Sequence, residues 1–385
     1  MKICILTQAL RNNYGGLLQA YALQKILLDM GHDVVTDKFG AKIEITLFGR
    51  VLHYVYSFIK RYVFNKVNYD PFKYLLTRYD KEAKERRIIS QNTDRFIEKH
   101  IKTIDFFNGR TRPHTATLNQ FDAIVVGSDQ TWRYIYNEYT PAYFLNFINN
   151  QNIKRIAYAA SFGKDDVDEY PLECLNICRA NLELFDGISV REDSGVKLCK
   201  EFLNADATHV LDPTLLIEKE DYIDLIECES INNRDNILMC YILDQSSSKT
   251  DSVKFIRKRL GLQVLKVMPQ ENYAFGYTQD VSKCVFPCVS EWIAGFRDAK
   301  FVVTDSFHGT VFSIIFNVPF ITITNNNRGN TRIVSLLRLF NLEHLMIESV
   351  EDINDSHFNH IDFIKVNSIK KQLQQKSLDF LKILN

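Results

Sequence analysis

The sequence carries no excess of charge of either sign. Its 385 residues include 47 Lys and Arg against 47 Asp and Glu, which gives a formal net charge of +0. Proteins that bind nucleic acid through their overall charge need a basic surplus. We therefore expect no nucleic-acid partner, although a local basic pocket for a small anion is compatible with this balance.

Signals for metal binding and for secretion are also missing. The eight cysteines form no C-x-x-C motif, and no histidine is close to the two pairs spaced by four, at positions 174 and 178 and at 284 and 288. We expect no metal site and reduced thiols typical of a cytosolic protein. Met1 to Gln8 lacks the apolar length and cleavage site of a signal peptide, so we expect a cytoplasmic location.

No apolar run reaches the roughly 20 residues that a membrane-spanning helix needs. The closest stretch, 43–67, is rich in Leu, Val, Tyr and Phe but is interrupted by Arg50, His53, Lys60 and Arg61. This pattern predicts a basic amphipathic helix, and two interpretations stay open. The helix either packs on its own domain or makes a peripheral contact with the inner face of the membrane.

The sequence does contain a regular alternation of strand-like and helical segments. Its 46% hydrophobic and 24% charged residues are ordinary for a soluble protein, and the length suits two domains. The predicted strands fall in two groups, 2–7, 33–37, 121–126, 155–161, 187–191 and 208–211, and then 236–242, 263–267, 301–304 and 319–323. This alternation predicts an α/β fold of two Rossmann-like lobes with an active-site cleft between them.

The expected domain boundaries follow from the same pattern. An N-terminal lobe over 1–217 carries a helical insertion at about 43–118, and a C-terminal lobe covers 218–360. A final helix is expected over 361–385, and whether it crosses back to the N-terminal lobe stays open.

Two loops that follow predicted strands of the N-terminal lobe are candidates for binding a sugar. In an open parallel sheet, ligands bind beyond the carboxyl ends of the strands. In the first loop, Gly15 allows a close backbone approach beside Asn13 and Tyr14, although a tight turn without a ligand fits equally. The second loop offers polar groups that can bond hydroxyls and a flat ring that can stack on a sugar, in residues Ser128, Asp129, Gln130 and Trp132.

Two further loops are candidates for binding an anion. Arg191 ends a predicted strand and can clamp a phosphate or carboxylate with two N–H groups, unless it pairs with neighbouring acids. Another strand ends before a predicted helix that offers free N–H groups at Ser306, Phe307, His308, Gly309 and Thr310. There His308 can donate a proton near neutral pH. Arg328 and Arg332, in a later polar loop, either close over the same anion or face solvent.

At these residues the chain resembles the polysaccharide pyruvyl transferase family. The resemblance runs through the segments NNYGGLLQAYALQKILLDMGH, FDAIVVGSDQTWR, RIAYAASFG, ISVREDSGVKL, VLDPTLL and FRDAKFVVTDSFHGTVFSIIFNVPFI. It implies the two-lobed GT-B fold, phosphoenolpyruvate as donor, and a sugar or lipid-linked oligosaccharide as acceptor in cell-surface polysaccharide biosynthesis, such as capsule or exopolysaccharide. It implies no cofactor.

The resemblance also assigns roles to single residues. Arg191 matches the family's donor-phosphate arginine, and His308 matches the histidine beside the phosphate-binding turn. Some relatives carry Arg-Leu-His at that turn, whereas this chain has Ser306-Phe307-His308. Either Arg328 or Arg332 replaces the missing cation, or donor affinity is lower.

The expected reaction transfers the pyruvyl group to a pair of sugar hydroxyls as a ketal. His308 is the candidate acid and Asp129 the candidate base, with the acceptor on the N-terminal lobe and the donor phosphate on the C-terminal lobe. Two alternatives stay open. One is a GT-B glycosyltransferase that uses a nucleotide-sugar donor, and the other is a non-catalytic scaffold of a polysaccharide biosynthesis complex.

Overall fold

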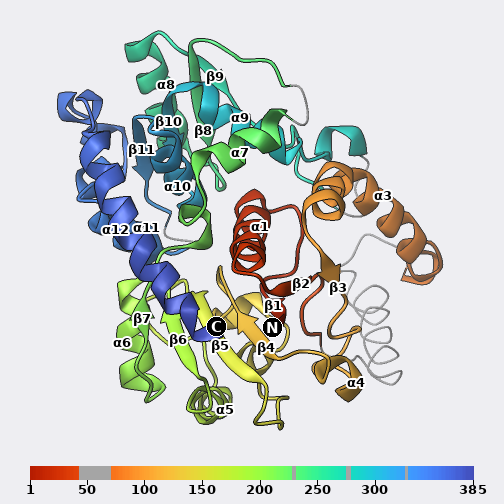
Figure 1. The fold of residues 1–385 in the computed structure, drawn as a ribbon. Coiled ribbons are helices and arrows are strands. Elements are labelled where there is room, and N and C mark those ends of the chain that lie inside the picture. The colour runs from red at the N-terminus through yellow and green to blue at the C-terminus, as the bar shows by residue number, and fades with distance from the viewer. Residues whose placement is uncertain (43–70, 228–230, 275–278, 326–327) are drawn as a thin grey trace.

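The computed structural model describes residues 1–42, 71–227, 231–274, 279–325 and 328–385 (Figure 1). The predicted amphipathic stretch 43–67 lies outside the described residues. Within the described parts, two parallel sheets stand one above the other, each covered by helices. This confirms the predicted two-lobed α/β fold.

The N-terminal lobe is built on a seven-stranded parallel sheet with strand order β3-β2-β1-β4-β5-β6-β7. Its strand order reverses next to β1, where the loops after β1 and β4 lie side by side. The insertion predicted to be helical also supplies the edge strand β3, which pairs with β2. The strands are β1 (Lys2–Leu6), β2 (Asp33–Asp37), β3 (Thr103–Ile104), β4 (Ala123–Val126), β5 (Lys154–Ala160), β6 (Gly187–Val190) and β7 (Thr208–His209).

The C-terminal lobe is built on a five-stranded parallel sheet with strand order β12-β11-β10-β8-β9. Its central strands β8 and β10 are almost entirely buried apolar residues, as expected for a sheet covered on both faces. The strands are β8 (Ile237–Tyr241), β9 (Gln263–Leu265), β10 (Ala299–Thr304), β11 (Phe320–Ile323) and β12 (Met346–Ile347).

Several helices begin at a polar side chain that caps the free N–H groups of the first turn. Asn13 accepts a hydrogen bond from the Gly16 amide at the start of α1, and Ser306 does the same for Gly309 at the start of α10. The helices are α1 (Tyr14–Asp29), α3 (Pro71–His100), α4 (Thr115–Leu118), α5 (Leu172–Leu182), α6 (Asp193–Phe202), α7 (Lys219–Glu227), α8 (Ser247–Leu260), α9 (Val289–Asp298), α10 (Phe307–Phe316), α11 (Thr331–Leu339) and α12 (Phe363–Leu381).

The last helix, α12, runs from the C-terminal lobe down to the N-terminal sheet (Figure 1). The Gln374 side chain donates a hydrogen bond to the Leu215 carbonyl (2.7 Å), and Lys154 donates one to the Ile383 carbonyl just beyond the helix (2.7 Å). One continuous apolar core includes residues of both lobes and of α12. The helix therefore ties the two lobes together.

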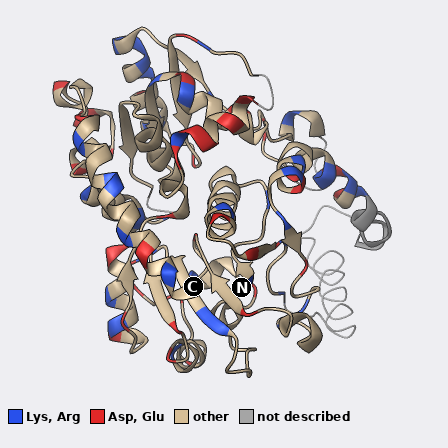
Figure 2. Ribbon diagram, viewed as in Figure 1, with Lys and Arg blue, Asp and Glu red and all other residues tan. Residues whose placement is uncertain are grey.

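Basic and acidic residues are interspersed along the chain in both lobes (Figure 2). This mixture matches the balanced net charge. None of the helices that the structure describes is long and apolar enough to cross a membrane.

Candidate functional site

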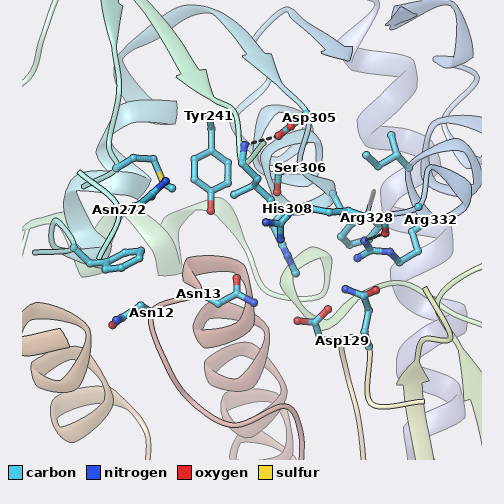
Figure 3. Close-up of a pocket in the computed structure, with 17 residues that line it drawn as sticks. Asn12, Asn13, Asp129, Tyr241, Asn272, Asp305, Ser306, His308, Arg328 and Arg332 are labelled. Carbon is cyan, nitrogen blue, oxygen red and sulfur yellow. Dashed lines mark hydrogen bonds between the residues drawn. The ribbon is translucent and has the colours of Figure 1, made fainter. Parts of the chain in front are cut away.

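A cavity of about 330 Å³ lies between the two lobes (Figure 3). Loops of the N-terminal lobe that follow β1 and β4 line one wall, and the C-terminal lobe lines the rest. Sequence-predicted site residues on its walls are Asn13, Asp129, Gln130, Ser306, Phe307, His308, Arg328 and Arg332. The fold thus brings candidates from three of the four predicted loops, and both later arginines, to one crevice.

His308 stands where the starts of α1 and α10 meet. Its imidazole packs on Gly15, where an added Cβ would lie 2.0 Å from Nδ1. Its Nε2 lies 3.7 Å from Oδ2 of Asp212, too far for a hydrogen bond but close enough for an ion pair when the ring is protonated. The start of a helix disfavours positive charge, so Asp212 is the group that stabilises an imidazolium here.

A buried ion-pair cluster lies behind His308. Arg191 donates to Asp212 at 2.6 Å and to Asp129 at 3.1 Å. Burial raises the pKa of Asp212, but His308 and Arg191 outweigh it and hold that pKa well below its ordinary value. Burial likewise raises the pKa of Asp129, and the charges of Arg191, His308 and Arg332 bring it below the ordinary value. Both carboxyl groups are therefore ionised at neutral pH.

Arg191 does not occupy the place expected of a direct phosphate clamp. Its side chain is 1% exposed, it is not among the residues that line the cavity, and its two terminal nitrogens are taken by carboxylates. Its guanidinium stacks on the ring of Phe307, 4.2 Å from the centroid. It pairs with acids as the alternative interpretation held, but with Asp129 and Asp212 rather than its sequence neighbours.

Two arginines of the C-terminal lobe reach the cavity instead. Arg328 forms an ion pair with Asp244 through two nitrogens, at 2.7 and 3.1 Å. Arg332 is buried, makes no salt bridge among the described residues, and has an unpartnered Nε there. Burial and the charge of Arg191 lower the pKa of Arg332 to about 10. Arg332 is therefore the cation that a bound anion would stabilise most.

The predicted sugar-binding residues are only partly at the cavity. Trp132 is fully buried, stacks on Phe144 and donates its indole N–H to the Tyr143 carbonyl, so it is a core residue and not a sugar platform. Tyr14 is the buried first residue of α1, and its hydroxyl donates to the Pro287 carbonyl at 3.0 Å.

The side chains or Cα atoms of three further predicted residues contact other protein groups and do not face the cavity. Ser128 is fully buried and donates to Asp212. Gly309 packs on Thr304, and the Thr310 hydroxyl donates to the carbonyl of Ser306, the N-cap residue of α10. The sequence pattern located these turns correctly, but it did not indicate which side chains face outward.

Several residues at the cavity or behind it were not predicted. Asp212 follows β7 and does not line the cavity, and the sequence marks it only as a carboxylate at a strand end. Tyr241, at the end of β8, points its hydroxyl into the cavity, and Asn12 and Asn272 lie on the same side (Figure 3). Phe286 also lines the cavity. Asn272 and Phe286 lie in loops without a motif, so nothing in the sequence marks them.

Among the described residues, no group of three or more His, Cys, Asp or Glu side chains is arranged to hold a metal ion. The candidate site combines three kinds of protein group. These are His308 beside the buried Asp212 carboxylate, Arg332 without a salt bridge in the described chain, and the start of α10 with its N–H groups. Together they suit a small, strongly negative ligand.

Comparison with known proteins gives a family and a set of distant structures. No curated protein matches the chain. A UDP-GlcNAc 2-epimerase from Neisseria meningitidis bound to UDP-GlcNAc is 10% identical with a TM-score of 0.49, covering 100% of this chain and 99% of that one. A glycosyltransferase from Rickettsia africae is 9% identical with a TM-score of 0.43, covering 98% and 93%.

A family model described as polysaccharide pyruvyl transferase matches residues 13–327. The match spans most of the chain, from the first loop of the cavity to the loop that precedes Arg328. It contains Asp129, Arg191, Asp212 and His308. The chain belongs to the polysaccharide pyruvyl transferase family.

Proposed function

We propose that the protein transfers the pyruvyl group of phosphoenolpyruvate to two hydroxyls of a sugar, forming a ketal and releasing phosphate. The reaction fits cell-surface polysaccharide biosynthesis, with a free or lipid-linked sugar as acceptor. In this proposal the methylene carbon of the donor gains a proton, and the neighbouring carbon becomes electrophilic. One hydroxyl attacks that carbon, phosphate leaves, and the second hydroxyl closes the ketal.

The observation that carries the proposal is that Arg332 and His308 both line the cavity. Arg332 is a buried cation with an unpartnered Nε among the described residues, and it lies beside the start of α10. The N–H groups there and the guanidinium hold the donor phosphate as negative charge develops on it. Arg191 acts behind them as a positioning residue, because it fixes Asp129 and Asp212.

His308 supplies the proton. The Asp212 carboxylate, 3.7 Å from Nε2, stabilises the imidazolium before transfer. After transfer, the neutral imidazole takes the proton of the first attacking hydroxyl. Phosphate, cleaved from the carbon but still held in the site, takes the proton of the second hydroxyl and is then released. Asp129 was the expected base, but its low pKa makes it a weak one. It serves better as an acceptor of a hydrogen bond that orients the sugar hydroxyl.

The test measures phosphate release from phosphoenolpyruvate with a panel of methyl hexopyranosides, together with mass spectrometry of the sugar product. We expect a pyruvyl ketal with wild-type protein. His308→Gln should lower kcat by about 10²–10⁴-fold while phosphoenolpyruvate still raises the melting temperature, because the phosphate contacts remain.

The same thermal assay separates the alternatives. Stabilisation by UDP- or GDP-sugars and not by phosphoenolpyruvate would favour a nucleotide-sugar glycosyltransferase. No stabilisation by any of these donors would favour a scaffold without catalysis. Unchanged turnover in His308→Gln would remove the acid role from this residue.

A further inference from the structure

The cavity has two ends of different chemistry. Arg328 and Arg332 lie at one end, with His308 between that end and the middle (Figure 3). At the other end, Asn12, Asn13, Asn272 and Tyr241 are grouped in the same view. Phe286, Met268 and Leu243 also line the cavity. None of these seven residues carries a charge, and we call them the neutral end. Asp305 also lines the cavity, and its carboxylate accepts from the Leu243 amide at 2.7 Å and pairs with Lys249 at 2.6 Å.

Helix α3 contacts residues of the neutral end that belong to each of the two lobes. The Thr93 hydroxyl donates to the Asn12 side-chain oxygen at 2.5 Å. One residue earlier, the Asn92 side chain donates to the Phe286 carbonyl at 2.8 Å, and the Phe286 amide donates to the Ile89 carbonyl at 3.0 Å. Positions 89, 92 and 93 share one face of the helix. The insertion thus holds an N-terminal amide and a C-terminal aromatic ring in fixed relative positions.

A second contact of α3 supports the loop that carries Asn272. The hydroxyl of the next residue, Tyr273, donates to Glu85 at 2.8 Å, and the Arg86 guanidinium lies 5.7 Å from the Tyr273 ring centroid. Phe286 also packs edge-on against Tyr14, with ring centroids 6.1 Å apart. The neutral end is therefore preformed.

The neutral end offers hydrogen-bond donors that the protein does not use. The Asn13 oxygen caps α1 and the Asn12 oxygen accepts from Thr93, so each leaves an NH₂ group with no partner in the described chain. The Tyr241 hydroxyl points into the cavity (Figure 3), and burial raises its pKa, so it stays a donor. Phe286 is half-buried and lines the cavity.

We infer that the neutral end is the acceptor subsite and that it takes an uncharged pyranose, stacked on Phe286 and bound through its hydroxyls by Asn12, Asn13 and Tyr241. Flat rings with amide and hydroxyl donors suit a sugar, whereas a uronate would lose water without gaining a cation. The inference rests on the proposed function for the donor at the other end. It gives Phe286 the platform role that Trp132 cannot fill.

The test measures sugar binding without donor, by saturation-transfer NMR with methyl glycosides of neutral hexoses and their uronate counterparts. We expect at least one neutral glycoside to bind wild-type protein about tenfold more tightly than its uronate. Phe286→Ala should weaken that binding by about 3–10-fold, and Phe286→Tyr should restore it. Phe255→Ala, an exposed phenylalanine on α8, is the matched control and should change nothing.

Three results would overturn the subsite: no neutral glycoside binds, a uronate binds as tightly, or Phe286→Ala binds unchanged. A thermal shift with phosphoenolpyruvate on the same samples tests the donor separately. If phosphoenolpyruvate binds and the sugar result fails, the subsite is wrong and the proposed function stands. If the sugar result holds and phosphoenolpyruvate does not bind, the pyruvyl transfer is wrong and the sugar site stands.

Discussion

Arg191 and Arg332 approach the same Phe307 ring, with guanidinium carbons 4.2 and 5.9 Å from its centroid. Arg191 has two carboxylate partners, whereas Arg332 has no salt bridge in the described chain. Burial and the charge of Arg191 therefore disfavour the charged form of Arg332. A bound phosphate dianion would instead favour the charged form of Arg332. The buried charge therefore helps ligand binding and lowers the stability of the ligand-free protein.

Arg332→Met tests that opposition. We expect the ligand-free melting temperature to rise by up to a few degrees, because a buried charge that has no direct salt bridge in the described chain is removed. The stabilisation that phosphate and phosphoenolpyruvate give the wild type should disappear. Thermal melts with and without each ligand measure both effects. Arg338→Met, on an exposed part of the same helix, should keep the ligand response. A variant that melts lower yet still responds to phosphate would contradict the assignment.

Asp212→Asn tests the buried ion pair. The variant leaves Arg191 facing a neutral amide, so we expect it to lose about 3–5 kcal/mol of unfolding free energy at neutral pH. Folding depresses the pKa of the Asp212 carboxyl. Such a carboxyl contributes its full stabilisation at pH values above its pKa in the unfolded chain, about 3.9. That stabilisation is lost as the pH falls towards the lower pKa of the folded state.

Urea unfolding at several pH values measures this dependence. The stability difference between wild type and Asp212→Asn should shrink as the pH falls below about 4. Asp206→Asn, which alters an exposed ion pair with Lys200, is the control and should show little difference at any pH. A gap that widens below about pH 4 would exclude a depressed pKa at Asp212.

Sequence patterns predicted the turns of this site better than the side chains. His308 and Asp129 were predicted at the cavity and lie there, because a polar residue directly after a buried strand must emerge at the sheet edge. Trp132 was misassigned because a strand-end loop can fold its ring back into the core, which no local pattern reveals. Asp212 was missed because its role depends on His308, which is distant in the sequence.

At the scale of elements, the site depends on two helix starts in contact. Gly15 is the second residue of α1, and His308 is the second residue of α10. A Cβ at Gly15 would overlap the imidazole, at 2.0 Å from Nδ1 and 2.2 Å from Cγ. At Gly16, one residue on, a Cβ would meet only the end of the Asn13 side chain, at 2.8 Å.

Gly15→Ala should therefore displace His308 and lower kcat by at least about tenfold, with loss of stability from the overlap. Gly16→Ala is the comparison in the same helix turn. There the added Cβ displaces Asn13 and not His308, so we expect weaker sugar binding but a kcat near that of the wild type, and alanine favours the helix by up to about 1 kcal/mol. Turnover and thermal melts of the two variants give the comparison. Equal effects of the two substitutions would show that the contact between α1 and α10 does not position His308.

The elements themselves were predicted unevenly. Apolar strands such as β4 and β10 and the long helix α1 follow clear patterns and were predicted. The strands β3 and β12 have two residues each, too few for a period to show. Helices α6, α7 and α11 were not predicted, because they are short and only part of each is apolar, whereas the equally short α10 is buried along its whole length.

At the scale of the whole molecule, the alternation of strands and helices predicted two lobes but could not place one against the other. The contacts that do so join residues far apart in the chain, such as Tyr14 with Pro287 and Gln374 with Leu215. A single apolar core contains Leu23 of α1, Phe320 of β11 and Leu381 of α12. The lobes should therefore unfold together despite their separate sheets.

The two tryptophans allow this cooperativity to be measured. Trp132 lies in the core of the N-terminal lobe and Trp292 in that of the C-terminal lobe, and the chain has no others. Fluorescence of Trp132→Phe and Trp292→Phe variants thus reports one lobe each. We expect both reporters to give the same urea midpoint, because α12 and the shared core couple the lobes.

Leu381→Ala, placed in each reporter background, makes the test decisive. Leu381 is 0% exposed at the end of α12, and its truncation should cost about 2–5 kcal/mol. Ile364, 87% exposed on the same helix, is the matched control, and Ile364→Ala should leave both midpoints in place. If the core is continuous, Leu381→Ala lowers the Trp132 and Trp292 midpoints equally. A shift confined to one tryptophan would mean that the lobes unfold separately and that α12 stabilises only the lobe that it contacts at Leu381.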